Sequence, residues 1–408
     1  MVKRRWRKAS HEEPAWLERE AMLLIGLFTE ANPRTRRWVS AVGMGILVVV
    51  CLFYWGIRRR PAIPVSERQV AQGGAWYDVR FTDPQFDTGK REHQGGIDTR
   101  LVAMMHRARR TLDVAVYDFD LMDVAQAMAA AAGRGVRVRM LTDTDTLDDQ
   151  LNKAAQAAFA VLRQADIVVL GDRRGAFMHD KFTVVDGEEV ETGSWNYTDG
   201  DTYRLDNNAI YVASAALAQN YEAEFEQMYA EGRFGRAKTS VAPHPHLVID
   251  GVAVENYFAP QDHVTTRIVA AIAKAKKVIR FMAFSFTSDR IGQAMLAKAS
   301  LGVRVEGVFE KTSSQTKYSE FAAMKQRGLP VYTDANPYAM HNKVILIDDE
   351  VVITGSFNFS RNADKENDEN VLIVHDPRLH AIYLQEYDRV MGAASKAAWQ
   401  RAGKPIGH

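Results

Sequence analysis

An internal duplication constrains the fold of this chain more than any other feature of its sequence. The nineteen residues MHDKFTVVDGEEVETGSWN at positions 178–196 return as MHNKVILIDDEVVITGSFN at positions 340–358, with ten identical residues and no gap. The similarity extends upstream, where residues 100–120 match residues 267–287. A repeated unit of roughly 140 residues is too long for a solenoid, and it predicts two similar lobes in one chain.

Both copies show the same succession of secondary-structure patterns. Each reads as a helix, an apolar strand, a second helix and a second strand, which opens at Gly135-Val136 in one copy and at Gly302-Val303 in the other. This succession predicts an α/β fold for each lobe. The 408 residues are enough to give both lobes a sizeable core.

The charge is distributed unevenly along the chain. Residues 1–60 carry twelve Lys or Arg against five Asp or Glu, whereas residues 61–408 carry 40 basic and 46 acidic residues. Proteins that bind nucleic acid through its phosphates usually present a broad basic face, and the body of this chain has no such overall excess. Cys51 is the only cysteine, which excludes an intramolecular disulfide and a cysteine-based metal site.

One segment is apolar enough to cross a membrane. Residues 38–57, WVSAVGMGILVVVCLFYWGI, hold no charge, and their length matches a hydrocarbon core crossed by one helix. The alternatives are a cleaved signal peptide and a buried core helix. A signal peptide would have a shorter apolar region and a small-residue cleavage site, whereas RRRP follows here. We therefore predict a single-pass anchor in the cell membrane.

The basic arm before this segment bears on orientation. Nine Lys or Arg among residues 1–37 favour an N-terminus inside and a body on the outer, periplasmic or extracellular, side, although residues 58–60 act against that orientation. The expected parts are a basic arm (1–37), a transmembrane helix (38–57), a linker (58–77), a first lobe (78–232), an inter-lobe linker (233–250), a second lobe (251–393) and a C-terminal tail (394–408).

The repeated string predicts a β-hairpin with polar groups at one end. In the first copy, residues 181–185 form the outgoing strand, Asp186-Gly187 is a strong turn signal, and residues 189–192 return. Side chains alternate along a strand, so His179 and Lys181 share one face. His341 and Lys343 do the same in the second copy.

Two such hairpins facing each other would form one anion-binding reaction site. The cations and amides suit the oxygens of a phosphate, and two imidazoles can divide nucleophilic attack and proton transfer because histidine titrates near neutrality. The candidate residues are His179, His341, Lys181, Lys343, Ser194, Ser356, Asn196 and Asn358. A zinc site is disfavoured because Lys is a poor second ligand, and a serine hydrolase is disfavoured because no G-x-S-x-G elbow is present.

The pattern H-x-K, four residues, Asp, then G-S-x-N, present twice, resembles the HKD motif of the phospholipase D superfamily. The resemblance covers residues 78 to 391 approximately, and it implies two similar α/β lobes about a pseudo-two-fold axis with one site between them. It also implies a covalent phosphohistidine and no metal or other cofactor. Asp186 and Asp348 match the motif aspartate, which mostly supports the fold in this superfamily; a turn-forming role is also what the hairpin predicts.

The two copies differ at one position that bears on mechanism. Glu369 lies 28 positions after His341, and relatives use such a glutamate to orient a catalytic imidazole; Asn207 occupies the equivalent place after His179. A carboxylate raises the basicity of its histidine partner, whereas an amide only orients it. The resemblance favours His179 as nucleophile and His341 as general acid, but the reverse holds if Glu369 serves its own copy. The sequence leaves open which histidine Glu369 touches.

Three functions remain open. The first is a membrane-anchored phosphodiesterase that hydrolyses or transfers phospholipid head groups, acting as a monomer because one chain holds both motifs. The second is an endonuclease of the same superfamily, because MHNKVILID, TGSFNFS and NDEN also resemble its bacterial endonuclease branch. The third is an inactive scaffold, which would have little reason to keep both His, both Lys and both Asn.

Overall fold

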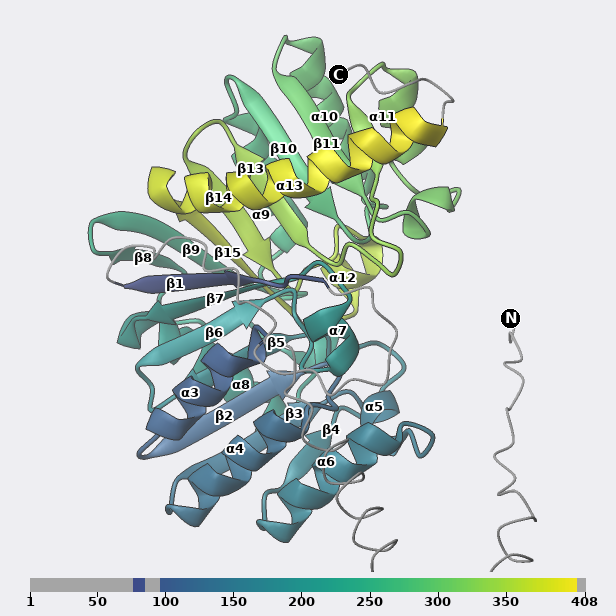
Figure 1. The fold of residues 1–408 in the computed structure, drawn as a ribbon. Helices are drawn as coiled ribbons and strands as arrows, with labels where there is room; N and C mark the ends of the chain where they lie inside the picture. Colours follow the sequence, from purple (N-terminus) through teal and green to yellow (C-terminus); the bar gives the residue numbers. More distant parts are fainter. Residues whose placement is uncertain (1–75, 85–95, 402–408) are drawn as a thin grey trace, which may run out of the picture. The chain divides into compact units, whose positions relative to one another are not determined.

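The computed structural model describes residues 76–84 and 96–401, which contain two mixed β-sheets (Figure 1). The first is a seven-stranded sheet with the order β1-β7-β6-β5-β2-β3-β4. Its strands are β1 (Tyr77–Phe81), β2 (Thr111–Val116), β3 (Arg137–Thr142), β4 (Val169–Gly171), β5 (Lys181–Val185), β6 (Glu189–Gly193) and β7 (Asn208–Ala213).

The second sheet repeats this arrangement in the later part of the chain. It has eight strands in the order β12-β11-β10-β13-β14-β15-β9-β8, so that β8 is its one addition to the pattern of the first sheet. Its strands are β8 (His246–Ile249), β9 (Val252–Ala259), β10 (Val278–Ala283), β11 (Arg304–Phe309), β12 (Val331–Thr333), β13 (Lys343–Ile347), β14 (Val351–Gly355) and β15 (Glu369–His375). The expected α/β class with two similar sheets is confirmed.

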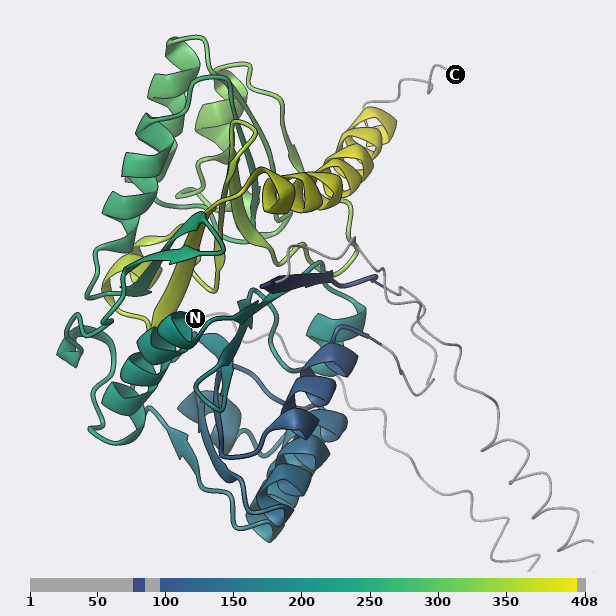
Figure 2. The same cartoon turned by 90° about the vertical axis from the view of Figure 1, so that its left-hand side faces the viewer.

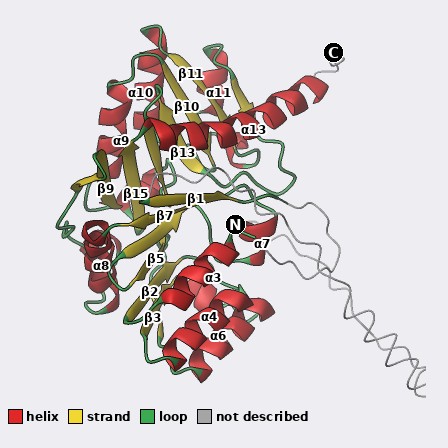
Figure 3. Ribbon diagram, turned by 60° about the vertical axis from the view of Figure 1, so that its left-hand side comes forward, coloured by secondary structure: helices red, strands yellow, loops and turns green. Residues whose placement is uncertain are grey.

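Helices cover both faces of each sheet. In the first lobe, α3 (Asp98–Arg107), α4 (Met122–Gly133) and α6 (Lys153–Gln164) lie on one face and α8 (Ala215–Tyr229) on the other (Figure 3). In the second lobe, α9 (Val264–Ala273) and α10 (Asp289–Ser300) lie opposite α13 (Pro377–Arg401) (Figure 2). The short helical elements are α5 (Thr144–Asp148), α7 (Asp199–Tyr203), η1 (Gly235–Ala237), η2 (Ser313–Gln315), α11 (Phe321–Gln326) and α12 (Arg361–Lys365).

The buried apolar residues form three clusters. One lies under the outer helices of the first lobe and one under those of the second. The third contains residues of both lobes, among them Phe182 and Tyr221 from the first and Val344 and Tyr383 from the second. Because this shared core joins the inner faces of the two sheets, it fixes hairpin β5–β6 relative to hairpin β13–β14.

Among the described residues, no helix is both long and apolar enough to cross a membrane. The predicted transmembrane helix at 38–57, the basic arm before it and most of the linker after it lie outside the described residues. The anchor therefore remains a prediction from the sequence.

Candidate active site

Each motif histidine lies two positions before the first residue of a central strand, where the other lobe holds its backbone. The N–H of His179 donates to the carbonyl of Asp368 at 3.0 Å, and the N–H of His341 donates to the carbonyl of Asp206 at 2.8 Å. Asp368 and Asp206 are equivalent positions in the two copies. These reciprocal contacts bring both motifs to one place between the two sheets.

The imidazoles are held crosswise, each by a residue of the other copy. Nδ1 of His179 lies 2.7 Å from Oε2 of Glu369, and Nδ1 of His341 lies 2.9 Å from Oδ1 of Asn207. The question that the sequence left open is thereby answered: Glu369 contacts the histidine of the first copy. With Nδ1 engaged, Nε2 is the nitrogen that each ring has left for a substrate.

The motif serines hold the two acceptors in place. The hydroxyl of Ser194 donates to Asn207 at 2.8 Å and accepts the N–H of Asn208, while the hydroxyl of Ser356 donates to Glu369 at 2.8 Å. These contacts favour a positioning role for the serines. Their expected role in binding phosphate stays a prediction.

Two buried ammonium groups supply the positive charge of the site. Nζ of Lys181 donates to the carbonyl of His179 at 2.8 Å, and Nζ of Lys343 donates to that of His341 at 2.6 Å. Burial lowers the pKa of Lys181 to about 8, and burial together with Lys181 lowers that of Lys343. Two like charges enclosed together favour an anion between them.

An aromatic ring lies beside each histidine–lysine pair. The ring centroid of Tyr117 is 5.0 Å from that of His179 and 5.0 Å from Nζ of Lys181. Phe284 takes the equivalent place in the second lobe, 4.5 Å from the ring of His341 and 4.8 Å from Nζ of Lys343. Such ring–cation contacts limit where each ammonium group can lie.

The motif asparagines keep an atom for a ligand. Oδ1 of Asn196 and Oδ1 of Asn358 are buried, and neither has a hydrogen-bond partner among the described residues. A buried polar atom without a partner is costly unless something else satisfies it. Each of these oxygens can accept a proton from a ligand but cannot bind a phosphate oxygen, so the expected phosphate contact of the asparagines stays a prediction.

The motif aspartates lie at the hairpin turns, away from the imidazoles. Asp186 has a φ of 54° and its carboxylate accepts the backbone N–H groups of Arg109, Arg110 and Thr111. Asp348 has a φ of 56° and accepts those of Lys276, Lys277 and Val278. Each aspartate ties its hairpin to the start of the neighbouring strand. These contacts favour the structural role expected for it, which stays a prediction.

The motif glycines allow a close approach of two strands. Gly193 has a φ of 156°, and a Cβ there would lie 2.2 Å from the carbonyl oxygen of Asn208. Gly355 has a φ of 147°, and a Cβ would lie 2.3 Å from that of Asn370. Only glycine fits these two positions, which set the direction of the chain into Ser194 and Ser356.

Burial gives the titrating groups of the site unusual proton affinities. Burial and the two lysines lower the pKa of His179, and burial and Lys343 lower the pKa of His341 to about 4. Burial raises the pKa of Glu369 to about 8, although Lys181 opposes this shift. Between those two values the site holds one proton, most of it on the Glu369–His179 pair.

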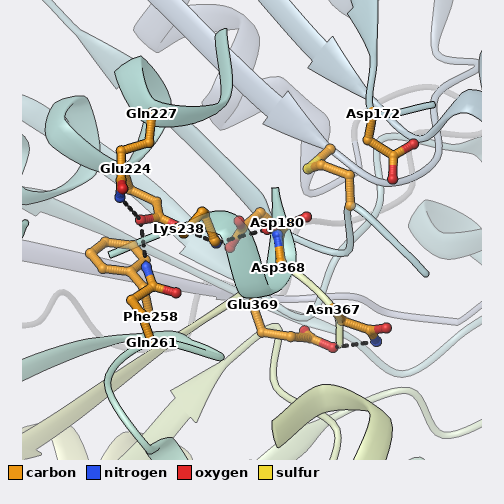
Figure 4. A network of polar contacts seen from close by, with 12 residues as sticks. Asp172, Asp180, Glu224, Gln227, Lys238, Phe258, Gln261, Asn367, Asp368 and Glu369 are labelled. Atoms are coloured by element: carbon orange, nitrogen blue, oxygen red, sulfur yellow. Dashed lines mark hydrogen bonds and ion pairs between the residues drawn. The ribbon is translucent and has the colours of Figure 1, made fainter. Parts of the chain in front are cut away.

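Sequence reasoning missed an ion-pair network beneath the site. Lys238, in the segment predicted as the inter-lobe linker, lies between the carboxylates of Glu224 and Asp368 with both of its partners buried (Figure 4). Asp201, which approaches His341, was missed as well. Among the described residues, no group of three or more His, Cys, Asp or Glu side chains is arranged to hold a metal ion.

The fold and the paired motifs define a protein with two phospholipase D-like halves. A family model described as cardiolipin synthase, PLD-like domain, matches residues 101–229 and again residues 268–391. The chain belongs to the phospholipase D superfamily.

Several relatives resemble parts of the chain. A phospholipase D from Rickettsia prowazekii is 37% identical over 134 residues, which are 33% of this chain and 65% of that protein. A mitochondrial cardiolipin hydrolase from Xenopus tropicalis is 34% identical over 139 residues, 34% of this chain and 64% of that protein. The match thus spans slightly less than two thirds of each of these relatives. Phosphatidylserine synthase from Haemophilus influenzae shares the fold, with a TM-score of 0.57 and 14% identity over 77% of this chain and 88% of that chain.

Proposed function

We propose that this protein is a phosphodiesterase that hydrolyses or transfers the head groups of phospholipids through a covalent phosphohistidine. The observation that carries the proposal is the crosswise arrangement of two buried imidazoles, each fixed at Nδ1 by Glu369 or Asn207, beside Lys181 and Lys343. Such a site can hold one phosphate between two cations and present an imidazole nitrogen to each of its two reactive sides.

In the first step, Nε2 of His179 attacks phosphorus. The bond from phosphorus to the leaving oxygen breaks, and Nε2–H of His341 gives its proton to that oxygen. The carboxylate of Glu369 accepts a hydrogen bond from Nδ1–H of His179, which keeps its proton, and so stabilises the positive charge that the ring gains on bonding to phosphorus. Lys181 and Lys343 balance the negative charge of the phosphoryl oxygens.

The second step reverses the roles around the same phosphorus. Nε2 of His341, now without a proton, takes one from water, and the water oxygen bonds to phosphorus as the phosphorus–nitrogen bond breaks. An alcohol in place of water gives head-group transfer. His179 returns to its neutral form, and His341 again holds the proton.

A phospholipid is favoured as substrate by three features. The body of the chain has an acidic excess, residues 38–57 predict an anchor that would keep the site at a bilayer, and two relatives are named for lipid hydrolysis. The orientation that the basic arm predicts would place the site on the outer side of the cell membrane. An endonuclease of the same superfamily remains the alternative, because one site chemistry serves both substrates.

A competition experiment tests this proposal. The full chain, purified in detergent, is incubated in EDTA with vesicles of phosphatidylcholine or cardiolipin together with single-stranded DNA, and the released products are measured. We expect phosphatidate with intact DNA, and no product from the His179→Ala variant. Cleaved DNA with intact lipid would instead identify the endonuclease, and a strict requirement for added divalent metal would refute the mechanism.

A further inference from the structure

The carboxylate that the first copy lacks at Asn207 is present six residues earlier. Aligned on the motifs, Asn207 is equivalent to Glu369, and Asp201 on α7 is equivalent to Ala363 on α12. The second copy therefore has its acid at the start of β15, whereas the first has its acid on a short helix. Each copy thus has one acid that contacts the motif histidine of the other copy, and the two acids stand at different positions.

Asp201 reaches the imidazole of the other lobe. Its Oδ1 lies 3.3 Å from Nδ1 of His341, beside the 2.9 Å contact that the same nitrogen makes with Asn207. The Nδ1 proton of His341 therefore faces an amide oxygen and a carboxylate oxygen together. For His179, Glu369 alone provides both the hydrogen-bond acceptor and the carboxylate at Nδ1.

The carboxylate of Asp201 is held firmly in place. Oδ1 accepts the backbone N–H and the side-chain Nδ2–H of Asn196 and the Nδ2–H of Asn207, each at 3.2 Å. Oδ2 accepts the hydroxyl of Thr198 at 3.2 Å. Asp201 is buried, and His341 is the only basic side chain that pairs with it among the described residues.

The charge of Asp201 differs from that of Glu369. Burial opposes ionisation of Asp201, but His341 and the N–H donors more than offset this, so its pKa lies below the ordinary range. Burial leaves the pKa of Glu369 raised to about 8. At neutral pH, His341 thus faces a negative charge, whereas the Glu369–His179 pair shares a proton.

We propose that Asp201 is the positioning carboxylate of His341, that it replaces the acid absent at Asn207, and that it assigns proton donation to His341 and nucleophilic attack to His179. This inference rests on the proposed function. The active form carries the site's single proton on His341, which faces Asp201 on one side and Lys343 and Lys181 on others. Removing the negative charge of Asp201 reduces the share of molecules in that form.

Leaving-group chemistry separates this role from a structural one. An alkoxide leaving group needs a proton from His341, whereas p-nitrophenolate leaves without one. In the full chain, Asp201→Asn should lower kcat/KM on phosphatidylcholine by about 100-fold, within the range of general acid catalysis. The initial burst of p-nitrophenolate from a p-nitrophenyl phosphodiester should keep its rate within about threefold, followed by slow turnover, because His341 also serves as base in the second step.

A relocation variant tests the replacement directly. Asp201→Ala with Asn207→Glu gives the first copy the Ala363 and Glu369 arrangement of the second, and it should recover at least ten times the lipid activity of Asp201→Ala alone. Asp199 lies on the same helix and pairs with Arg204. Asp199→Asn also removes an acid from that helix, so it is the matched control and should behave as the unchanged protein. Across pH, Asp201→Asn should lower the plateau of kcat/KM without moving its alkaline limb.

Three outcomes would overturn the assignment. They are an unchanged lipid activity in Asp201→Asn, an equal loss of lipid turnover and burst rate in a variant that melts like the unchanged protein, and no recovery in the folded relocation variant. Failure of the proposed function itself looks different, because the unchanged protein would then release no lipid product, with a p-nitrophenolate burst if it is an endonuclease and without one if it is inactive.

Discussion

Nζ of Lys238 lies 2.8 Å from the carboxylate of Asp368, inside the protein and directly beneath the site. The backbone carbonyl of the same aspartate accepts the N–H of His179, and the next residue is Glu369. The carboxylate also accepts the N–H of Gly235. The chain that joins the lobes is therefore fastened to the strand that carries the partner of His179.

Replacing Lys238 by alanine should destabilise the protein severely. The change leaves Glu224 buried without a cation and leaves Asp368 with Arg174 alone, and breaking a buried ion pair in this way costs about 3–5 kcal/mol. Urea denaturation at pH 7 measures the loss, with Lys274→Ala as a surface control of the same charge change. If Lys238→Ala lost no more stability than Lys274→Ala, the buried ion pairs of Lys238 would add nothing to the free energy of unfolding.

The pH dependence should report the single proton of the site. With the pKa of His341 at about 4 and that of Glu369 at about 8, the singly protonated site exists between those values, and kcat/KM should fall as the pH rises through 8. Deprotonation of Lys181, whose pKa is also about 8, acts in the same direction.

Glu369→Gln distinguishes these two causes of the alkaline limb. The amide cannot take up the proton that Glu369 binds, so the site should lose its single proton at lower pH and the limb should move towards the pKa of His341. We also expect kcat to fall by about 100-fold or more, because the charge on His179 is no longer balanced. Profiles of kcat/KM from pH 4 to 9.5 test this. If the alkaline limb of Glu369→Gln stayed where it is in the unchanged protein, deprotonation of Lys181 would be its cause.

The repeat predicted much of this architecture because it is written in local patterns. Alternation and the Asp-Gly turn at 186 indicated the first hairpin, and the second followed from the alignment. The partner of Glu369 did not follow, because it lies 190 residues away across two sheets and strand periodicity carries no information about packing between lobes. The sequence contained only one hint of Asp201, which is the missing carboxylate at Asn207. The alignment of the two copies did not reveal Asp201, because its equivalent in the second copy is Ala363, which has no acid.

The turn aspartates should affect stability more than chemistry. Asp186→Asn keeps a side chain that tolerates the left-handed backbone, but it weakens the acceptor of three N–H groups, so we expect a loss of about 1–2 kcal/mol. Those donors also hold the pKa of Asp186 below its ordinary value, so the stabilisation should be present at neutral pH and lost as the pH falls. Urea denaturation at pH 7 and pH 4 measures both effects, and a kcat changed more than threefold in the folded variant would contradict a purely structural role.

A buried polar group of the first lobe has an apolar equivalent in the second. Glu191 accepts the hydroxyl of Tyr197, which lies 2.7 Å from that of Thr183, and Oε1 of Glu191 has no partner among the described residues. The equivalent residues in the second lobe are Ile353, Phe359 and Ile345, all of them in its apolar core.

Exchanging this group for its equivalents should make stability less dependent on pH. Burial raises the pKa of Glu191 to about 8, so the folded state binds its proton more tightly than the unfolded chain, and stability should fall as the pH rises from the ordinary carboxyl range through 8. The triple variant Thr183→Ile, Glu191→Ile, Tyr197→Phe lacks this penalty. Each pKa unit corresponds to about 1.4 kcal/mol. The stability of the triple variant relative to the unchanged protein should therefore be at least about 2 kcal/mol greater at pH 9 than at pH 5. Urea denaturation at pH 5 and at pH 9 tests this. Tyr197→Phe alone removes a donor from the buried carboxyl and should instead destabilise the protein. If the triple variant and the unchanged protein differed in stability by the same amount at both pH values, Glu191 would not titrate in the folded protein.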